Sequence, residues 1–466
     1  MTEHTHQAGQ PTHLTAALGL GSVTLFGLAY MTPIIVLGIF GIIAEASEGA
    51  SAGAYLVATL AMLFTAASYA RMSVHYPVAG SSYTYVRKAL DSRLGFIVGW
   101  TILLDYLFLP LVIWLIGAAY LTGEFPSVPS WVWIVLFIVT TTALNIVGLK
   151  VADKANFVLM AMQFLVLALF VLFTVVYMVS NHGGGSLLSA NPFTGEGGFS
   201  AIASGAAIAA YSFLGFDAVS TLTEDTKDPQ RNIPRAIMLV ALVGGVVFVT
   251  VAYALTLVEP GSTFDNADSL AADTARTIGG SLFAAFFVGG LIIGQFTSGL
   301  AAQASVSRLL FAMGRDGVLP KGFFGRLSDR FATPIFNIVL CGLIGLGALF
   351  LDVATSTSFI NFGAFTAFTL VNLSVIGYFM RHRHTAAGSG LNPATYVVVP
   401  LIGALVDVYL LTKLDSAALM LGASWLAIGV VYLLVLTRGL RVPPPEMSLV
   451  EDDTTRSRQG PARAQE

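Results

Sequence analysis

Long apolar segments dominate this sequence and decide the environment in which it can fold. Hydrophobic side chains make up 56% of its 466 residues, and Asp, Glu, Lys and Arg together make up 11%. Soluble domains carry about 25% charged residues. A chain with so few charges cannot cover a water-facing surface, so we expect the lipid bilayer to be part of its solvent. Its net charge of −3 gives no global basic field for nucleic acid, which excludes that partner.

Twelve segments are long and apolar enough to cross a bilayer, for which a helix needs about 20 residues. They run over residues 16–44, 51–71, 94–121, 131–149, 155–180, 201–224, 236–257, 278–306, 333–351, 357–380, 394–412 and 416–437. The fold class predicted is therefore an all-α polytopic membrane protein of about twelve transmembrane helices. Residues 1–14 are expected to form an N-terminal tail and residues 441–466 a disordered tail, because the latter are polar and Pro-rich.

The basic residues orient these segments. Loops on the cytoplasmic side collect Lys and Arg. With the N-terminus inside, 21 of the 23 basic residues fall in inner loops or the C-terminal tail, and only Arg276 and Lys413 fall outside. This split predicts a multi-pass protein of the cell membrane (inner or plasma membrane) with both termini in the cytoplasm.

The first segment contains a feature that is expected to break the helix. Pro33 removes a backbone donor and clashes with the preceding turn, and Thr32 before it is typical of a helix N-cap. We expect the helix to unwind near Tyr30, Met31 and Thr32 and to restart at Pro33 and Ile34, with free N–H groups facing the gap. The alternative is a simple proline kink, which membrane helices tolerate.

The sixth segment carries a second candidate break in Tyr211-Ser212-Phe213-Leu214-Gly215-Phe216-Asp217. Gly215 lies mid-span among aromatic residues, and Asp217 follows two residues later. Paired interruptions at equivalent places of two halves are typical of transport sites. The alternative for this segment is a small-residue contact between helices.

Few acids fall inside the predicted spans, and each is a functional hypothesis because a buried charge is costly in a membrane. Asp105 lies about 16 Å into the third segment at the standard helical rise, which is near the midplane. Asp105 and Asp217 are candidates to bind a substrate ammonium group or to carry a proton, although Asp217 could instead cap the broken helix. Glu224, near an inner end, is expected to act in gating or coupling or to pair with Arg231 or Arg235. Asp407 is expected to serve packing.

Several motifs resemble those of the amino acid–polyamine–organocation permeases. They are Pro77-Val78-Ala79-Gly80-Ser81-Ser82-Tyr83-Thr84-Tyr85, Gly215-Phe216-Asp217 with Glu224-Asp225-Thr226-Lys227-Asp228-Pro229, and Ser307-Arg308-Leu309-Leu310-Phe311-Ala312-Met313-Gly314-Arg315-Asp316-Gly317. The resemblance runs from about residue 15 to 440, and within the family it is greatest to bacterial putrescine importers. Gly38 stands where those importers carry an aspartate.

The resemblance implies two inverted five-helix repeats, at about residues 15–180 and 200–380, in which the first and sixth helices are broken, and two peripheral helices at 394–437. It also implies a secondary transporter with no cofactor, which imports a polyamine such as putrescine in symport with protons. An amino acid–proton symporter is the alternative, and a non-transporting sensor a more distant one. The residues expected to bind substrate are Tyr30, Met31, Thr32, Pro33, Ile34, Asp105, Tyr211, Ser212, Phe213, Gly215, Phe216 and Asp217, and those expected to act as gate or coupling residues are Glu224 and Arg231.

Other functional classes lack their signatures in the sequence. The seven histidines lie near the chain end or in loops, and none forms an intramembrane pair at metal-binding spacing. No repeated carbonyl or acidic ring indicates a channel filter. We therefore expect neither a metal site nor an enzyme.

Overall fold

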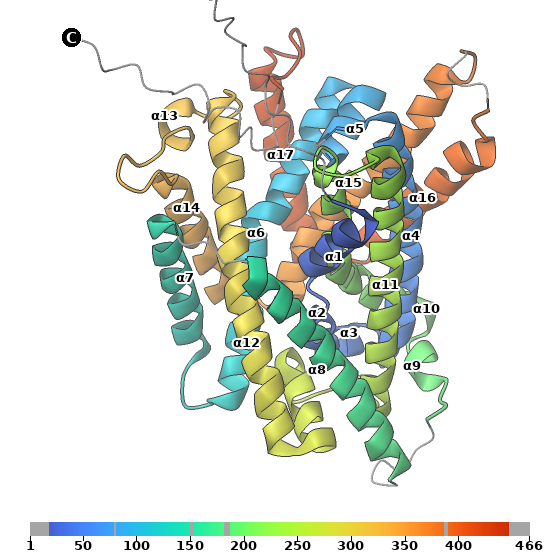
Figure 1. The fold of residues 1–466 in the computed structure, drawn as a ribbon, viewed down its shortest axis with the longest axis vertical. Coiled ribbons are helices and arrows are strands. Elements are labelled where there is room, and N and C mark those ends of the chain that lie inside the picture. The colour runs from blue at the N-terminus through green and yellow to red at the C-terminus, as the bar shows by residue number, and fades with distance from the viewer. Residues whose placement is uncertain (1–17, 79–80, 149–152, 181–186, 386–389, 447–466) are drawn as a thin grey trace, which may run out of the picture.

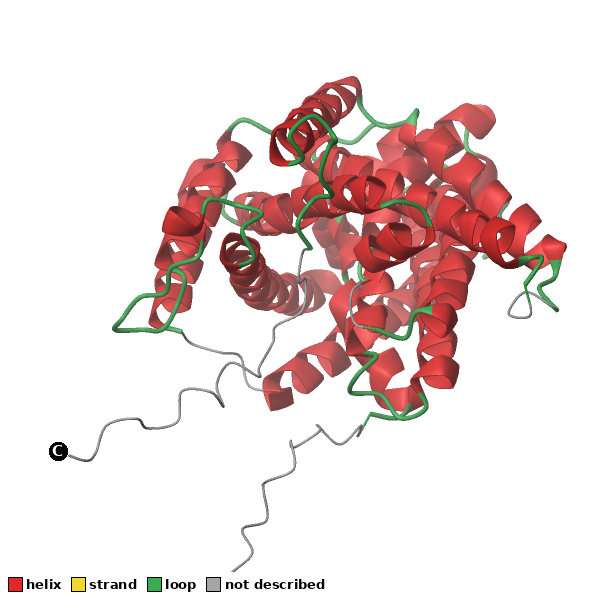
Figure 2. Ribbon diagram, turned by 90° about the horizontal axis from the view of Figure 1, so that it is seen from above, coloured by secondary structure: helices red, strands yellow, loops and turns green. Residues whose placement is uncertain are grey.

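The computed structural model describes residues 18–78, 81–148, 153–180, 187–385 and 390–446, most of which lie in helices (Figures 1 and 2). Among these residues the only β-type pairing is an isolated bridge between Leu18 and Thr226. The prediction of an all-α fold is confirmed. The predicted tail at 1–14 lies outside the described residues, as does the part of the predicted tail 441–466 that runs from 447 to 466.

The helices of the first half of the chain follow the predicted segments, with one addition. They are α1 (Leu20–Met31), α2 (Ile35–Gly38), α3 (Phe40–Ala46), α4 (Ser51–His75), α5 (Ser81–Ala89), α6 (Ser92–Glu124), α7 (Ser130–Val147) and α8 (Asp153–Val179). The addition is α5, whose polar composition gave no spanning signal. It follows α4 and brings its first residues, Ser81 and Ser82, to the lining of the central cavity described below.

The second half repeats the pattern of long helices with short ones between them. They are α9 (Asn191–Thr194), α10 (Gly198–Ala209), η1 (Ala210–Phe213), η2 (Asp217–Leu222), α11 (Pro229–Val258), η3 (Ala267–Ser269), α12 (Leu270–Arg315), α13 (Lys321–Phe324), α14 (Ile335–Gly345), η4 (Leu346–Leu349), α15 (Val353–His382), η6 (Ala394–Val398), α16 (Val399–Leu411) and α17 (Ser416–Leu436). The breaks fall in the first and sixth predicted spans, five spans apart.

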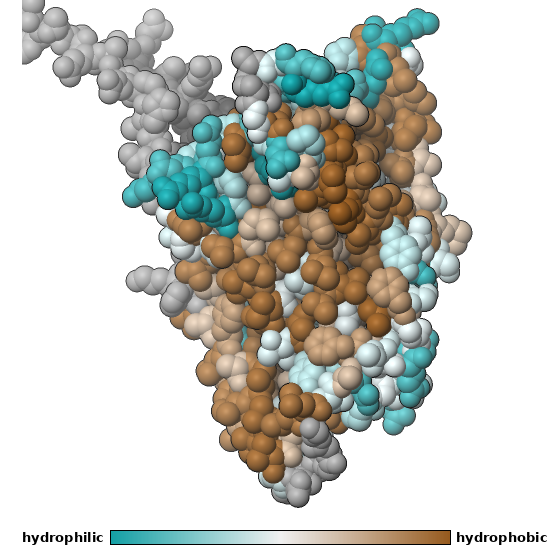
Figure 3. All heavy atoms as spheres, turned by 90° about the vertical axis from the view of Figure 1, so that its right-hand side faces the viewer, coloured by the Kyte–Doolittle hydropathy of each residue, from teal (hydrophilic) through white to brown (hydrophobic). Residues whose placement is uncertain are grey.

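Eleven helical segments of the described chain are long and apolar enough to cross a membrane. The predicted ninth span corresponds to a shorter apolar helix, Ile335–Leu349. Hydrophobic residues cover much of the face shown in Figure 3, and hydrophilic residues gather toward its upper end. The protein is therefore a multi-pass membrane protein.

Small residues let the helices approach closely, as is usual where lipid supplies no hydrophobic drive for helix association. A Cβ added to Gly27 on α1 would lie 2.6 Å from side-chain atoms of both Val219 and Val240. A Cβ added to Gly41 on α3 would collide with the backbone carbonyl of Ala267. Glycine at these two positions therefore allows α1 to pack against η2 and α11, and α3 to pack against η3.

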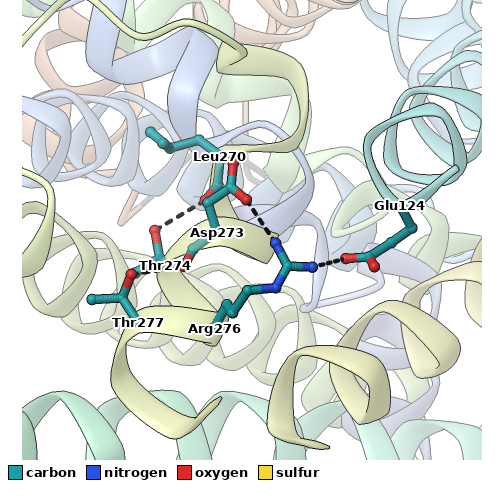
Figure 4. A network of polar contacts seen from close by, with 6 residues as sticks. All are labelled: Glu124, Leu270, Asp273, Thr274, Arg276 and Thr277. Atoms are coloured by element: carbon teal, nitrogen blue, oxygen red, sulfur yellow. Dashed lines mark hydrogen bonds and ion pairs between the residues drawn. The ribbon is translucent and has the colours of Figure 1, made fainter. Parts of the chain in front are cut away.

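An ion-pair network joins the end of α6 to the start of α12 (Figure 4). These two helix ends lie in the lower part of Figure 1, away from α5 and α13 at the top. Arg276 donates to Glu124 Oε1 at 2.7 Å and to Asp273 Oδ1 at 3.1 Å. The network uses one of the two basic residues that the charge pattern places outside. At a half-exposed site its contribution to stability is about 1 kcal/mol or less, so it fixes the position of two helix ends more than it stabilises the fold.

Candidate functional site

A cavity of about 620 Å³ lies between the two helix breaks. This volume is within the range of about 300–1,000 Å³ that is typical of small-molecule sites. Its lining comes from α1, α2, α4, α5, α6, η1, η2, α12 and α15 and from the turns at the two breaks, and it reaches Ser305, Arg308 and Ala312 near the basic end of α12. Residues of α3 are not among those that line it. The cavity therefore opens toward the end of the molecule that carries the basic loops.

The first break is present, but its geometry differs from the one predicted. Helix α1 ends at Met31, and Thr32 follows in the left-handed region at φ 51°. Helix α2 starts at Ile35, with Ile34 at the N-cap position and no side-chain cap. The prediction that Thr32 caps a helix restarting at Pro33 was wrong, because the Thr32 hydroxyl instead approaches the carbonyl oxygens of Ala29 and Tyr30 at 3.4 Å.

The N–H groups of this break are already engaged. The Thr32 N–H donates to Ala29 O at 3.3 Å, and the Ile35 N–H donates to Thr32 O at 2.9 Å. The Ile34 N–H donates to the side-chain Oε1 of Gln163 on α8 at 3.4 Å, and Pro33 has no N–H. The expectation of free donors facing the gap is therefore not met from Thr32 to Ile35, and this segment offers no ready site for a carboxylate.

The second break meets the first at Gly215. Helix α10 passes into η1 and ends at Phe213, the chain turns at Leu214, and Gly215 adopts φ 114° before η2 begins at Asp217. A Cβ at Gly215 would lie 2.5 Å from the Tyr30 ring and 3.2 Å from the Met31 nitrogen. Glycine is needed here both for the backbone angle and for the contact between the two broken helices.

The two candidate acids both line the cavity but differ in their surroundings. Asp217 starts η2, where its carboxylate lies beside the backbone N–H groups of Gly215 and Ala218. Asp105 projects from α6, and its Oδ1 has no hydrogen-bond partner in the described part of the chain. The two carboxylates are close enough to interact electrostatically. Asp217 is thus partly satisfied by the helix start, and Asp105 is the acid left available to a ligand.

Aromatic rings complete the region around the acids. Tyr30, which is 40% exposed, and Tyr106 line the cavity, their hydroxyls interact with each other, and both lie within electrostatic range of Asp105 and Asp217. Tyr211 lines the same cavity. Carboxylates combined with aromatic faces attract ammonium groups, so this part of the cavity is suited to a cationic amine.

The structure places seven of the predicted binding residues at the cavity, namely Tyr30, Met31, Thr32, Asp105, Tyr211, Gly215 and Asp217. The other five predicted residues, Pro33, Ile34, Ser212, Phe213 and Phe216, are not among the lining residues.

Three of those five pack behind the cavity. Ser212 shares a hydrogen bond of 3.0 Å with Tyr55 on α4. The ring of Phe213 lies 5.1 Å from that of Phe248, and Phe216 lies against Tyr69 and Phe368. These residues were predicted to bind substrate because they are close to a helix break in the sequence, but this closeness did not indicate the direction of their side chains.

Sequence reasoning missed several cavity residues on helices that do not break. They include Tyr69, Ser81, Ser82, Tyr106, Gln295, Arg308 and Phe368. Tyr106 directly follows the candidate acid Asp105, and this position could have identified it as a cavity residue. Tyr69 and Phe368 had no such signal in a chain with 15 Tyr and 32 Phe.

The predicted gate residues lie at the basic end of the molecule. Glu224 and Arg231 are both exposed, and the ion pairs recorded among the described residues do not join Glu224 to Arg231 or Arg235. A backbone pairing is present instead, in which Leu18 N–H donates to Asp225 O at 3.1 Å and Lys227 N–H donates to Leu18 O at 2.9 Å. This pairing connects the chain just before α1 to the loop after η2.

The chain is similar to known proteins along most of its length. Residues 22–437 match the model of a family described as amino acid permease. The chain is 40% identical over 439 residues to the low-affinity putrescine importer PlaP of Escherichia coli K12, covering 93% of this chain and 96% of the importer. Over 436 and 454 residues it is 28% identical to the methylthioribose transporter and to the branched-chain amino acid permease BcaP of Bacillus subtilis. These alignments cover 89% and 91% of this chain, and 92% and 94% of the two relatives.

Proposed function

This chain belongs to the amino acid permease family, and from that premise we propose that it is a secondary active transporter that imports a polyamine such as putrescine, driven by the proton gradient. The relatives named above are described as importers, transporters or permeases of small molecules. Because these relatives move small molecules, we interpret the cavity as a site that binds a transported solute and not as a site that catalyses a reaction.

One observation carries the proposal for an amine. Asp105 and Asp217 face a cavity that also presents the rings of Tyr30, Tyr106 and Tyr211. Two nearby carboxylates repel each other, and a cation between them relieves that repulsion. A diamine offers two ammonium groups and no carboxylate, so it matches acids and aromatic faces.

The hydrogen-bonded backbone of the first break also favours an amine over an amino acid. A zwitterionic amino acid needs donors for its carboxylate, which transporters of this architecture supply from a helix start. In this chain the N–H groups of Thr32, Ile34 and Ile35 already have acceptors. The amino acid alternative therefore loses the donors that the sequence had suggested.

An amino acid symporter remains the second candidate because of Arg308. This residue lines the same cavity, and a guanidinium is suited to bind a carboxylate. The similarity to the branched-chain permease supports this candidate as well. Arg308 lies near the basic end of α12, whereas two acids and several tyrosine rings line the same cavity, so we rank the amine first.

Proton coupling is proposed for Asp105. A carboxylate that faces a cavity inside a membrane without a recorded cation partner can bind either a proton or a substrate ammonium group. If the proton and the ammonium group replace each other at Asp105, proton movement and amine movement are coupled.

Orientation follows from the basic residues. If the end that carries them faces the cytoplasm, the cavity described above is open to the inside, and both termini lie in the cytoplasm of a cell with this protein in its inner or plasma membrane. The exposed Glu224 and Arg231 would then belong to an inner gate that is open in this conformation.

A competition assay tests the substrate proposal. Purified protein in proteoliposomes is given labelled putrescine together with unlabelled putrescine, spermidine, arginine or leucine. We expect accumulation of label that the amines reduce more strongly than leucine does. If putrescine does not enter and leucine does, the amino acid candidate replaces ours, and binding without accumulation of any solute would indicate a sensor.

A further inference from the structure

Asp407 is an acid buried in the membrane region that the proposed transport cycle does not use. It lies on α16 and has no exposed surface. Thr65 on α4 donates a hydrogen bond to its Oδ2 at 3.0 Å, and Asn372 on α15 donates to the same oxygen at 2.9 Å. Asn372 also donates to the Thr65 hydroxyl at 3.1 Å. The three side chains form a closed triangle that joins three helices.

The surroundings are shaped for this triangle. A Cβ at Gly403, one turn before Asp407 on α16, would lie 2.8 Å from Asn372 Oδ1, so glycine leaves room for the amide. Among the described residues no basic side chain is recorded as a partner of Asp407. An acid in such a place is expensive, which indicates that the contact has a use beyond filling space.

The triangle lies one helical turn from the wall of the cavity on two helices. Thr65 and Tyr69 are four residues apart on α4, and Phe368 and Asn372 are four residues apart on α15, a spacing that places each pair on one face. Tyr69 and Phe368 both line the cavity, and their rings lie 5.9 Å apart at a near-perpendicular angle.

Phe216, from the second helix break, packs against both rings from behind the cavity, and the three rings together form one aromatic wall. Its ring lies 5.6 Å from that of Tyr69 and 5.4 Å from that of Phe368. A shift of α4 against α15 would therefore change the aromatic wall and the segment that leads into Asp217. The triangle fixes the spacing of these two helices from behind.

The second peripheral helix, α17, is attached to the core by a different pair of hydrogen bonds. Trp100 on α6 and Trp425 on α17 each donate an indole N–H to the other's backbone carbonyl at 2.9 Å. That contact involves one core helix, whereas Asp407 holds two core helices that both contribute to the cavity. The attachment of α16 is thus placed to influence the site.

We propose that Asp407 is a positioning residue for substrate binding: with Thr65 and Asn372 it clamps α16 to α4 and α15 and so sets the aromatic wall formed by Tyr69, Phe216 and Phe368. The hydrogen bonds, rather than the negative charge, carry this role. Asparagine at position 407 keeps an oxygen that accepts the same two hydrogen bonds, and its amide nitrogen would replace the Oδ1 of Asp407, which has no partner among the described residues. Leucine would leave the Thr65 and Asn372 donors unmet.

The first test compares Asp407→Leu, Asp407→Asn and, as a matched control, Leu410→Ala. Leu410 is a fully buried residue of the same helix, and its truncation weakens packing without touching the triangle. We expect Asp407→Leu to raise the KM for putrescine about fivefold, as loss of about 1 kcal/mol of hydrogen bonding predicts, with Vmax per folded protein within about twofold of wild type. Asp407→Asn should keep the wild-type KM, and Leu410→Ala should lower only the Tm.

A second readout does not depend on the substrate, since the KM experiment rests on the proposed function. In a Cys341→Ala background, Ala364→Cys on the cavity face of α15 is labelled with a maleimide. Adding Asp407→Leu should change the labelling rate at least about threefold, and adding Asp407→Asn or Leu410→Ala should not. If wild-type protein does not transport putrescine, the proposed function fails while this measurement still tests the clamp.

Two results would overturn the inference. One is an Asp407→Leu variant that folds and keeps both the wild-type KM and the wild-type labelling rate. The other is an Asp407→Asn variant that takes up substrate without dependence on the proton gradient, because Asp407 would then act as a proton carrier and not as a clamp.

Discussion

Gly215 lies directly against Tyr30, so that a Cβ at position 215 would be 2.5 Å from the tyrosine ring. This contact joins the break in the sixth span to the break in the first span and brings Asp217 to the cavity that Asp105 faces. The site is thus created where two interrupted helices meet. Its substrate preference depends on which backbone N–H groups and carboxylates at the two breaks have no partner within the protein.

The Gly215→Ala variant is predicted to lose most transport. The added methyl group must displace Tyr30 or the Met31 backbone, and φ 114° is strained for alanine. We expect uptake to fall more than about tenfold at unchanged surface expression. Gly198→Ala is the control, because Gly198 also has a positive φ of 66° but a Cβ there meets nothing within 4 Å. Equal losses in the two variants would show that backbone strain, and not the contact between the breaks, is responsible.

The Asp105→Asn variant is predicted to raise the KM for the amine at least about tenfold, which corresponds to roughly 1.4 kcal/mol. The reason is the loss of the charge that faces the substrate ammonium group inside the membrane. Initial rates of labelled putrescine uptake measure the effect, and Asp265→Asn in an exposed loop serves as the control. An unchanged KM would remove Asp105 from the binding site.

The sequence predicted part of this site because some of its features are local. Pro33 and Gly215 mark their own breaks through backbone sterics, and the depth of Asp105 follows from the fixed rise of a helix in a long apolar run. Thr32 was assigned the wrong role, because its hydroxyl turns back to the carbonyl oxygens of Ala29 and Tyr30. The Ile34 N–H, which an N-cap side chain would have accepted from, is taken instead by Gln163, 129 residues away.

Side-chain direction was harder to predict than helix position. Phe213 and Phe216 were expected to face the substrate and pack behind the cavity instead, while Tyr69 and Phe368 face it from helices without a break. Where a helix is apolar on nearly every face, its sequence has no periodic pattern that indicates which face is directed toward the cavity. Only the packing of all the spans together decides which aromatic residues line the cavity.

The Gln163→Leu variant tests why an amino acid is disfavoured. Removing the amide leaves the buried Ile34 N–H without its acceptor. Because Thr32 and Ile35 on either side of Ile34 line the cavity, we expect a carboxylate bound at this break to accept from that N–H. We expect leucine to inhibit labelled putrescine uptake several-fold more strongly in this variant than in wild type, with Thr174→Val on the same helix as the control. No gain in inhibition would mean that the engaged N–H groups do not set the substrate preference.

The Glu224→Gln variant tests the proposed inner gate. Glu224 is exposed when the cavity is open toward the basic loops, and we propose that its charge is used when that end closes. Uptake should slow several-fold while equilibrium binding of putrescine stays within about twofold of wild type, since a gate acts on the conformational step. Asp225→Asn, the neighbouring acid, is the control, and wild-type uptake rates in Glu224→Gln would exclude this gating role.

We propose that this protein imports a cationic amine in symport with protons. Initial uptake of labelled putrescine into proteoliposomes tests this directly, measured with an imposed inward proton gradient, without it, and with a protonophore. We expect accumulation that requires the gradient, collapses with the protonophore and does not need sodium. Uptake that ignores the protonophore and requires sodium would contradict it.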